Sequence, residues 1–128
     1  MKALNPGKIH PPFAAYSNGV SSGDLLVTSG QLGISVDGEI PKDVEAQARL
    51  IFTAIDAILA EGNMDRRDVL RLNTYVTARN HMAGYMTVRD QWARGLNPLP
   101  ASTLMIVSGF TRPDFLIEIE ALAWRIKS

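Results

Sequence analysis

The apolar segment at residues 115–125, FLIEIEALAWR, constrains the fold of this 128-residue chain more than any other feature. Its alternating pattern predicts a β-strand, because successive side chains of a strand point to opposite faces of a sheet. One face would carry core-type residues, namely Phe115, Ile117, Ile119, Ala121 and Ala123. The opposite face would also be largely apolar, with Leu116, Glu118, Glu120, Leu122, Trp124 and Ile126. A sheet that contains this strand therefore needs cover on both faces.

Two helices are predicted from apolar residues that recur every three or four positions. The first helix spans residues 43–61, with Asp43 as its N-cap and Gly62 as its end. The second helix is expected to begin at Asn80 and to end at Gly95. Its buried side would consist of Met82, Tyr85, Met86, Arg89, Trp92 and Ala93.

Four further strands are expected around these helices, at residues 24–29, 31–36, 69–77 and 102–107. Gly30, between the first two, indicates a bulge or a place where another group approaches the backbone. The resulting order β-β-α-β-α-β-β predicts a single α+β domain over residues 1–128, a mixed sheet with both helices on one face. Since two helices cover only one face, we expect the other face to pack against further copies of the chain in a homo-oligomer.

Composition excludes several classes of function. Lysine and arginine total 13 and aspartate and glutamate total 13, and this balance argues against binding to nucleic acids or anionic membranes. The absence of cysteine excludes disulfides, thiolate metal sites and a cysteine nucleophile. The two histidines lack metal-ligand spacing, so no metal is expected. With no apolar segment of signal-peptide or membrane-spanning type, we expect a cytoplasmic protein.

Glu118 and Glu120 are the candidate groups for acid–base chemistry. They lie on the same face of the predicted strand, roughly 7 Å apart. Apolar neighbours would raise the pKa of a carboxyl group there, which suits a general acid or base. Alternatively, the two glutamates mark a rim or pair with a basic residue across a subunit contact. This alternative is preferred for Glu120, whereas both interpretations stay open for Glu118.

Several segments, in their order and spacing, resemble the Rid family (reactive intermediate deaminases, also called YjgF). They are AAYSNG around Tyr16, LLVTSGQLG, KDVEAQAR, Pro100-Ala101 and IEIEALA, and together they span most of the chain. The resemblance implies a chorismate-mutase-like fold. It further implies a homotrimer, in which three sheets form a central β-barrel, the helices lie outside, and ligand clefts separate neighbouring subunits.

The resemblance also implies a reaction, the hydrolysis of enamines or imines to a carbonyl compound and ammonia, without a metal or organic cofactor. By motif, Glu118 corresponds to the glutamate that holds water, and Tyr16, Ser29 and Gly30 correspond to ligand-binding residues. The arginine that grips the substrate carboxylate in the family motif Pro-Ala-Arg-Ser is missing. Ser102 stands in its place, which assigns the chain to an Arg-less branch.

This replacement leaves two functions open. One is an enzyme in which Ser102, Ser29 and the Gly30 amide hold the polar end of a small metabolite, which need not carry a carboxylate. The other is a non-catalytic module of the same fold that binds or senses a metabolite. A neutral hydroxyl gives a weaker grip than a guanidinium, and nothing in the sequence positions Arg112 or Arg79 as a substitute.

Overall fold

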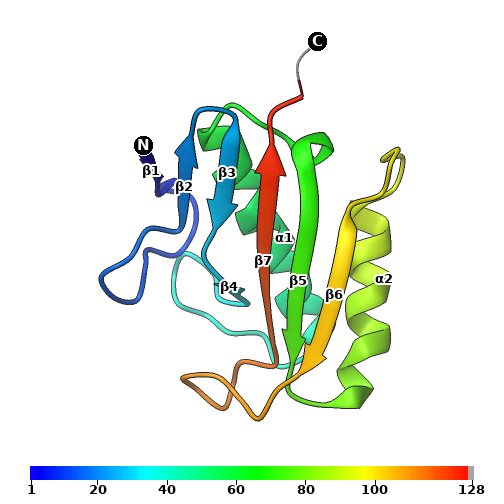
Figure 1. Cartoon of the computed structure of the whole chain (residues 1–128). Coiled ribbons are helices and arrows are strands. Elements are labelled where there is room, and N and C mark those ends of the chain that lie inside the picture. Colours follow the sequence, from blue (N-terminus) through cyan, green and yellow to red (C-terminus); the bar gives the residue numbers. More distant parts are fainter. Residues whose placement is uncertain (127–128) are drawn as a thin grey trace.

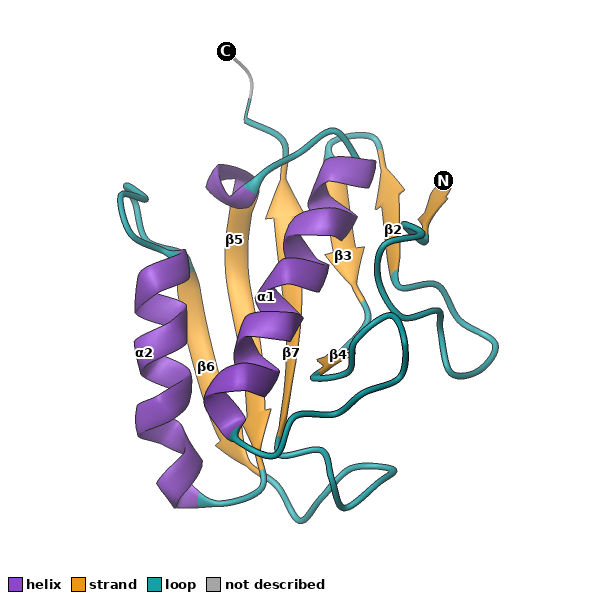
Figure 2. Cartoon of the chain, turned by 180° about the vertical axis from the view of Figure 1, so that it is seen from behind, coloured by secondary structure: helices purple, strands orange, loops and turns teal. Residues whose placement is uncertain are grey.

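The structure is a computed structural model that describes residues 1–126, and it consists of one mixed sheet with two helices on one face (Figures 1 and 2). This confirms the α+β architecture expected from the sequence. The sheet order is β1-β2-β3-β7-β5-β6, and the short β4 pairs with β7 beyond the end of β3. The strands are β1 Lys2–Leu4, β2 Gly19–Ser22, β3 Leu25–Thr28, β4 Gln31–Leu32, β5 Val69–Val76, β6 Ala101–Ile106 and β7 Ile117–Trp124. The helices are α1 Val44–Glu61 and α2 Met82–Trp92, with single 3₁₀ turns at Arg66–Asp68 and Arg79–His81.

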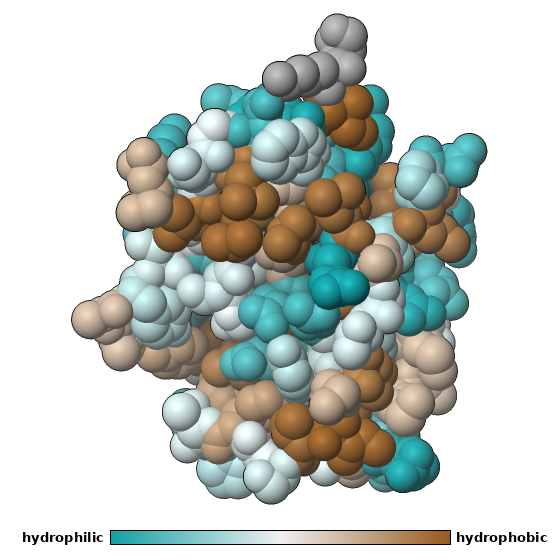
Figure 3. All heavy atoms as spheres, in the orientation of Figure 1, coloured by the Kyte–Doolittle hydropathy of each residue, from teal (hydrophilic) through white to brown (hydrophobic). Residues whose placement is uncertain are grey.

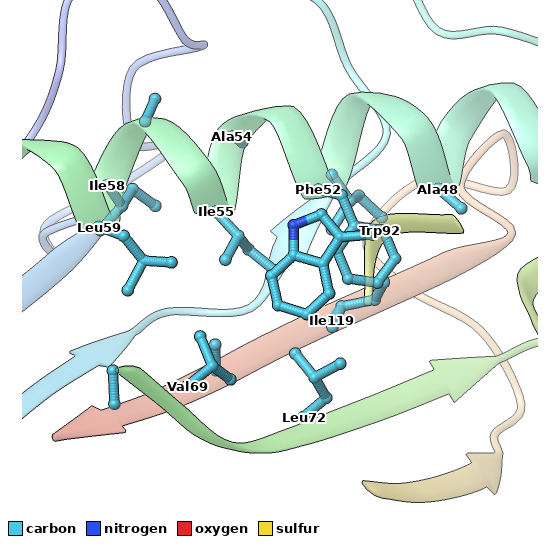
Figure 4. Packing of buried hydrophobic residues seen from close by; sticks show 14 of the residues in the cluster. Ala48, Phe52, Ala54, Ile55, Ile58, Leu59, Val69, Leu72, Trp92 and Ile119 are labelled. Carbon is cyan, nitrogen blue, oxygen red and sulfur yellow. The ribbon is translucent and has the colours of Figure 1, made fainter. Parts of the chain in front are cut away.

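β7 lies in the middle of the sheet, antiparallel to β3, β4 and β5, while β5 and β6 run parallel. Its alternation is as predicted. The side chains of one set are almost fully buried in the core that includes the helices, namely Ile117, Ile119, Ala121 and Ala123, and Phe115, which was predicted as part of the strand, is buried in the loop before it. In Figure 4 the apolar side chains of α1 pack over Leu72, Val69 and Ile119 of the sheet, with the Trp92 ring stacked on Phe52 at 4.8 Å.

Helix α1 begins where the sequence predicts, because the Asp43 side chain accepts a hydrogen bond from Ala46 N at 3.2 Å. Its end has a different cause from the one expected. Gly62 has φ of −91°, so it is not the left-handed residue, and Asn63 takes that role with φ of 57°. A Cβ on Gly62 would lie 2.6 Å from Leu26 Cδ1, so glycine is needed there for space against the sheet.

Helix α2 differs from the expectation at its start. Asn80 does not cap it, because residues 79–81 form a 3₁₀ turn and no side-chain cap hydrogen bond is made. Tyr85 and Trp92 are buried as predicted, and Val88 joins them. Gly95 has φ of 85° and follows the helix as a left-handed residue, as expected.

The first 36 residues contain the main errors of the sequence-based prediction. β1 and β2 were not expected, because Gly19–Ser22 carries little strand propensity and is held by pairing with β3 across a turn at Gly23. The strand expected at residues 31–36 is only Gln31–Leu32, and it pairs with β7.

Gln47 of α1 fixes the chain that leads into β7. This side chain is fully buried, and its amide donates hydrogen bonds to Pro41 O at 2.8 Å and Asp114 O at 2.9 Å. Its oxygen accepts one from Leu116 N at 3.0 Å. Three backbone groups of two loops are thereby satisfied by one helical side chain, which sets where β7 starts.

The face of the sheet that the helices leave open carries exposed apolar side chains around a polar centre. They are Leu25, Val27, Met105, Leu122 and Trp124. Figure 3 shows this face, with a band of hydrophobic atoms over the upper part of the sheet and hydrophilic atoms below it. None of the helices within residues 1–126 has the length and apolarity needed to span a membrane.

We expect Gln47→Ala to destabilise the protein by about 3 kcal/mol, because it removes a fully buried side chain and leaves three part-buried backbone groups without its hydrogen bonds. Urea unfolding monitored by circular dichroism measures the change. Arg49→Ala, on the exposed side of the same helix, is the matched control and should cost below about 0.5 kcal/mol. Equal effects of the two variants would contradict the role assigned to Gln47.

Candidate functional site

A pocket of about 520 Å³ opens beside the start of β7 and brings together four of the five residues selected from the sequence. Tyr16, Ser29, Gly30 and Glu118 all line it. The rest of its lining is Phe13, Ala14, Leu32, Phe110 and Thr111. Its size is in the range of small-molecule binding sites, and its wall is mostly apolar with a few polar groups.

Glu118 reaches this pocket because of its place in the sheet. It is the second residue of β7, directly opposite Leu32 of β4 and Tyr75 of β5, with its side chain on the open face. The carboxyl group packs against the α-carbon of Gly30, where an added Cβ would lie 2.5 Å from Glu118 Cδ. The close approach that Gly30 suggested in the sequence is therefore made by the candidate acid itself.

The environment of Glu118 disfavours its charge. Burial raises the pKa of its carboxyl group, and the negative charge of Glu120 on the same face raises it further. Glu120 accepts a hydrogen bond from the Tyr75 hydroxyl at 2.7 Å, and that bond raises the pKa of Tyr75. Glu120 is thus held by Tyr75, and Glu118 is the carboxyl group of the pair that lines the pocket.

Ser29 and Tyr16 bring hydroxyl groups to the pocket in addition to that of Thr111, and existing hydrogen bonds define what Ser29 and Tyr16 can offer. The Ser29 hydroxyl donates to Ser17 O at 2.6 Å, which leaves its oxygen lone pairs to accept from a ligand. The Tyr16 oxygen accepts from Phe13 N at 3.2 Å, which leaves its proton to donate.

Ser102 does not lie in this pocket within one protomer. It is opposite Leu72 in the parallel pair β5–β6, and Leu72 faces the helices, so Ser102 lies on the helix side of the sheet edge. It lines a smaller cavity of about 230 Å³ with Arg89 and Leu99 among its neighbours. The structure therefore separates Ser102 from Glu118 by both strand position and sheet face.

Neither arginine considered from the sequence lines the pocket. Arg112 follows Thr111 of the lining, but its guanidinium pairs with Asp114 at 3.0 Å and lies over the Phe115 ring. Arg79 belongs to the 3₁₀ turn before α2. Among residues 1–126, no group of three or more histidine, cysteine or acidic side chains is arranged to hold a metal ion.

Sequence reasoning missed Phe13, Phe110 and Thr111, which complete the lining. Phe13 stands three residues before Tyr16, and this spacing was the one available signal for it. Phe110 and Thr111 come from the irregular loop between β6 and β7, whose course depends on tertiary contacts. No local pattern in the sequence places such loop residues beside Glu118.

Comparison with known proteins assigns the family. The family model described as "Endoribonuclease L-PSP" matches residues 8–125. TdcF of Escherichia coli K12, named a putative reactive intermediate deaminase, is 32% identical over 122 residues, which cover 94% of this chain and 91% of that protein. The chain belongs to the Rid (YjgF) family.

Further relatives of this Rid protein agree with the assignment. The E. coli K12 protein named 2-iminobutanoate/2-iminopropanoate deaminase is 31% identical, with 86% of this chain and 87% of that one covered. The crystal structures of the E. coli YjgF gene product and of E. coli TdcF with bound serine each superpose with a TM-score of 0.92 and 28% identity. Each superposition covers 98% of this chain and 100% of the other, which confirms the YjgF-like fold.

We expect Glu118→Gln to stabilise the protein at neutral pH, because the neutral amide avoids the desolvation of a carboxylate and the repulsion by Glu120. The raised pKa means that folded Glu118 holds its proton at pH values where the unfolded chain has lost it. Wild-type stability therefore falls as pH rises from the ordinary value of 4.5 through the raised pKa. The advantage of the variant should be greatest above that range and disappear well below it.

Urea unfolding of both proteins between acid and neutral pH measures this difference. The exposed Glu39→Gln is the control and should track the wild type across the range. A constant offset between Glu118→Gln and wild type at every pH would contradict a perturbed Glu118.

Proposed function

We propose that this Rid protein hydrolyses enamine or imine intermediates to a carbonyl compound and ammonia, with Glu118 as the acid–base group. Membership of a family whose relatives are named reactive intermediate deaminases supports the reaction class. The observation that carries the proposal is the partly buried Glu118 carboxyl group, packed on Gly30 in a pocket with Tyr16 and Ser29.

The chemistry follows from one carboxyl group that exchanges protons with nitrogen and with water. Water attacks the imine carbon, and the C=N electron pair moves to nitrogen, which takes a proton from Glu118. The resulting carboxylate removes a proton from the added water and leaves a neutral carbinolamine. Glu118 then transfers the hydroxyl proton of the carbinolamine from oxygen to nitrogen. An electron pair of the oxygen forms C=O, the C–N bond breaks, and the nitrogen leaves as ammonia. A pKa raised towards neutrality suits both directions of transfer.

The hydroxyl groups have complementary roles in this scheme. The Tyr16 hydroxyl can donate a hydrogen bond to the oxygen of the attacking water and, later, to the oxygen of the carbonyl product. The Ser29 hydroxyl already donates its proton to Ser17 O, so its oxygen accepts a hydrogen bond from the substrate nitrogen. Gly30 gives the carboxyl group and the ligand room to approach the backbone.

We further propose that the protein is a homotrimer whose clefts lie between subunits. The exposed apolar residues of the open sheet face support assembly through that face, because water-exposed Leu122 and Trp124 are buried when sheets pack together. Ser102 then contributes to a pocket only as a residue of a neighbouring copy. The cytoplasmic location and the lack of nucleic-acid partners remain predictions from the sequence.

A non-catalytic binding module is the second candidate, and the serine at position 102 motivates it. The two candidates are separated by ammonia release from 2-aminoacrylate generated in situ by a dehydratase. We expect the wild type to be active and Glu118→Gln to lose about 100-fold or more of the rate, with Glu39→Gln as a matched control of unchanged rate. Activity that appears only in Ser102→Arg would support the binding module.

Assembly is tested by placing a charge on the open face. We expect Leu122→Lys to convert a trimer to monomers in sedimentation velocity, because a lysine cannot be buried between packed sheets without a partner. Thr53→Lys is the control, since Thr53 is exposed on α1, on the helix side of the sheet. A monomeric wild type, or an intact trimer of Leu122→Lys, would refute assembly through this face.

A further inference from the structure

The polar side chains that line the Glu118 pocket are Glu118, Tyr16, Ser29 and Thr111, and none of them is cationic. Glu118 offers carboxyl oxygens, and the Ser29 oxygen is left to accept because its proton is held by Ser17 O. A protonated imine, C=NH₂⁺, has two N–H donors and no acceptor, and so it matches this pair. A carboxylate is acceptor-only, and among these side chains it finds neutral hydroxyl donors such as Tyr16 and no cation.

The aromatic wall of the pocket is fixed before any ligand arrives. The Phe13 ring is half exposed, stacks on His10 at a centroid distance of 4.7 Å and meets the edge of Phe115 at 6.2 Å. The backbone N–H of Phe13 donates to the Tyr16 hydroxyl at 3.2 Å, which links the two aromatic residues of the wall. Exposed aromatic faces held in this way favour a flat apolar group or a cation above the ring.

Charges around the pocket point the same way. Glu118 lines it, and Glu120 lies two residues along on the same face. The cation of the adjoining loop, Arg112, is directed to Asp114 and stacked on Phe115. On the opposite side of Phe13, Nδ1 of His10 is 2.7 Å from Pro11 O, so the imidazole bonds within its own loop. The residues that line the pocket therefore include an acidic group and no cation, which favours an iminium over a carboxylate.

We infer that the preferred substrates of this pocket are imines of primary amines that carry an aromatic or similar apolar group and no carboxylate. This inference rests on the proposed hydrolysis and specifies its substrate class. The balance is RCH=NH₂⁺ plus H₂O to RCHO plus NH₄⁺: oxygen bonds to the imine carbon, the C–N bond breaks, and Glu118 transfers both protons of the water from oxygen to nitrogen, one after the other. The reaction that supplies such a substrate is the two-electron oxidation of a primary amine.

A pair of substrates that differ by one carboxylate tests the inference. A flavin L-amino-acid oxidase acting on phenylalanine releases the imine with a carboxylate, and a flavin monoamine oxidase acting on phenylethylamine releases the imine without it. Rapid quenching with borodeuteride converts remaining imine to deuterated amine and carbonyl product to deuterated alcohol. Mass spectrometry of the two products gives the rate of hydrolysis with and without the Rid protein.

We expect the protein to accelerate hydrolysis of the carboxylate-free imine by about tenfold more than that of its carboxylate counterpart, since like charges in a confined site repel. Equal acceleration, or preference for the carboxylate, would overturn the substrate class and leave the proposed reaction standing. Acceleration of neither imine, with 2-aminoacrylate also unchanged, would overturn both.

Two further measurements keep the test independent of turnover and of folding. Calorimetric titration should detect phenylethylammonium and not phenylacetate, and the reverse order would overturn the inference. Phe13→Ala should reduce the acceleration for the phenylethyl imine several-fold more than for the imine of propylamine. Val36→Ala, at an exposed apolar residue that does not line the pocket, should change neither rate, and a Phe13→Ala variant indistinguishable from it would contradict the aromatic wall.

Discussion

The contact between the Glu118 carboxyl group and the backbone at Gly30 depends on the position of β7 at the centre of the sheet. Pairing with β4 and β5 fixes which side chains of β7 face the helices and which face outward. A slip by one residue would exchange Ile117 and Ile119 for Glu118 and Glu120 in the core, which burial of charge forbids. The same hydrophobic alternation that builds the core therefore delivers the acid to the pocket.

A carboxyl group held in this position is costly to the folded state and useful to chemistry. Partial burial and the neighbouring Glu120 both favour its neutral form. A solvent-exposed glutamate would instead be ionised at neutral pH and would have no proton to donate. Glu120 accepts a hydrogen bond from the Tyr75 hydroxyl and Glu118 does not, so the two carboxyl groups differ in environment although they lie two residues apart. Different environments for paired acids are the usual origin of distinct acid and base roles.

Much of this fold could be predicted from patterns that are local in sequence. The α1 stripe and the two faces of β7 depend on periodicity, the Asp43 cap depends on the residue type at the helix start, and all three agree with the structure. Residues with weak propensity could not be predicted, because β2 is a strand only through its pairing with β3. Tyr16, Ser29, Gly30 and Glu118 were selected through motifs and do lie together, whereas Ser102 lies elsewhere in the protomer because strand register decides its face. The loop residue Phe110 has no local signal, since its place is set by contacts distant in sequence.

Gln47 anchors one end of the loop that lines the pocket. By anchoring Pro41, Asp114 and Leu116, this one amide holds the base of the β6–β7 connection to α1, and the stretch around Phe110 and Thr111 projects beyond the anchored part. Substitutions and small insertions in that stretch can reshape the cavity while the anchor and the sheet stay intact. A change in the loop around Phe110 and Thr111 can therefore alter which ligand fits the pocket without altering the sheet or the helices.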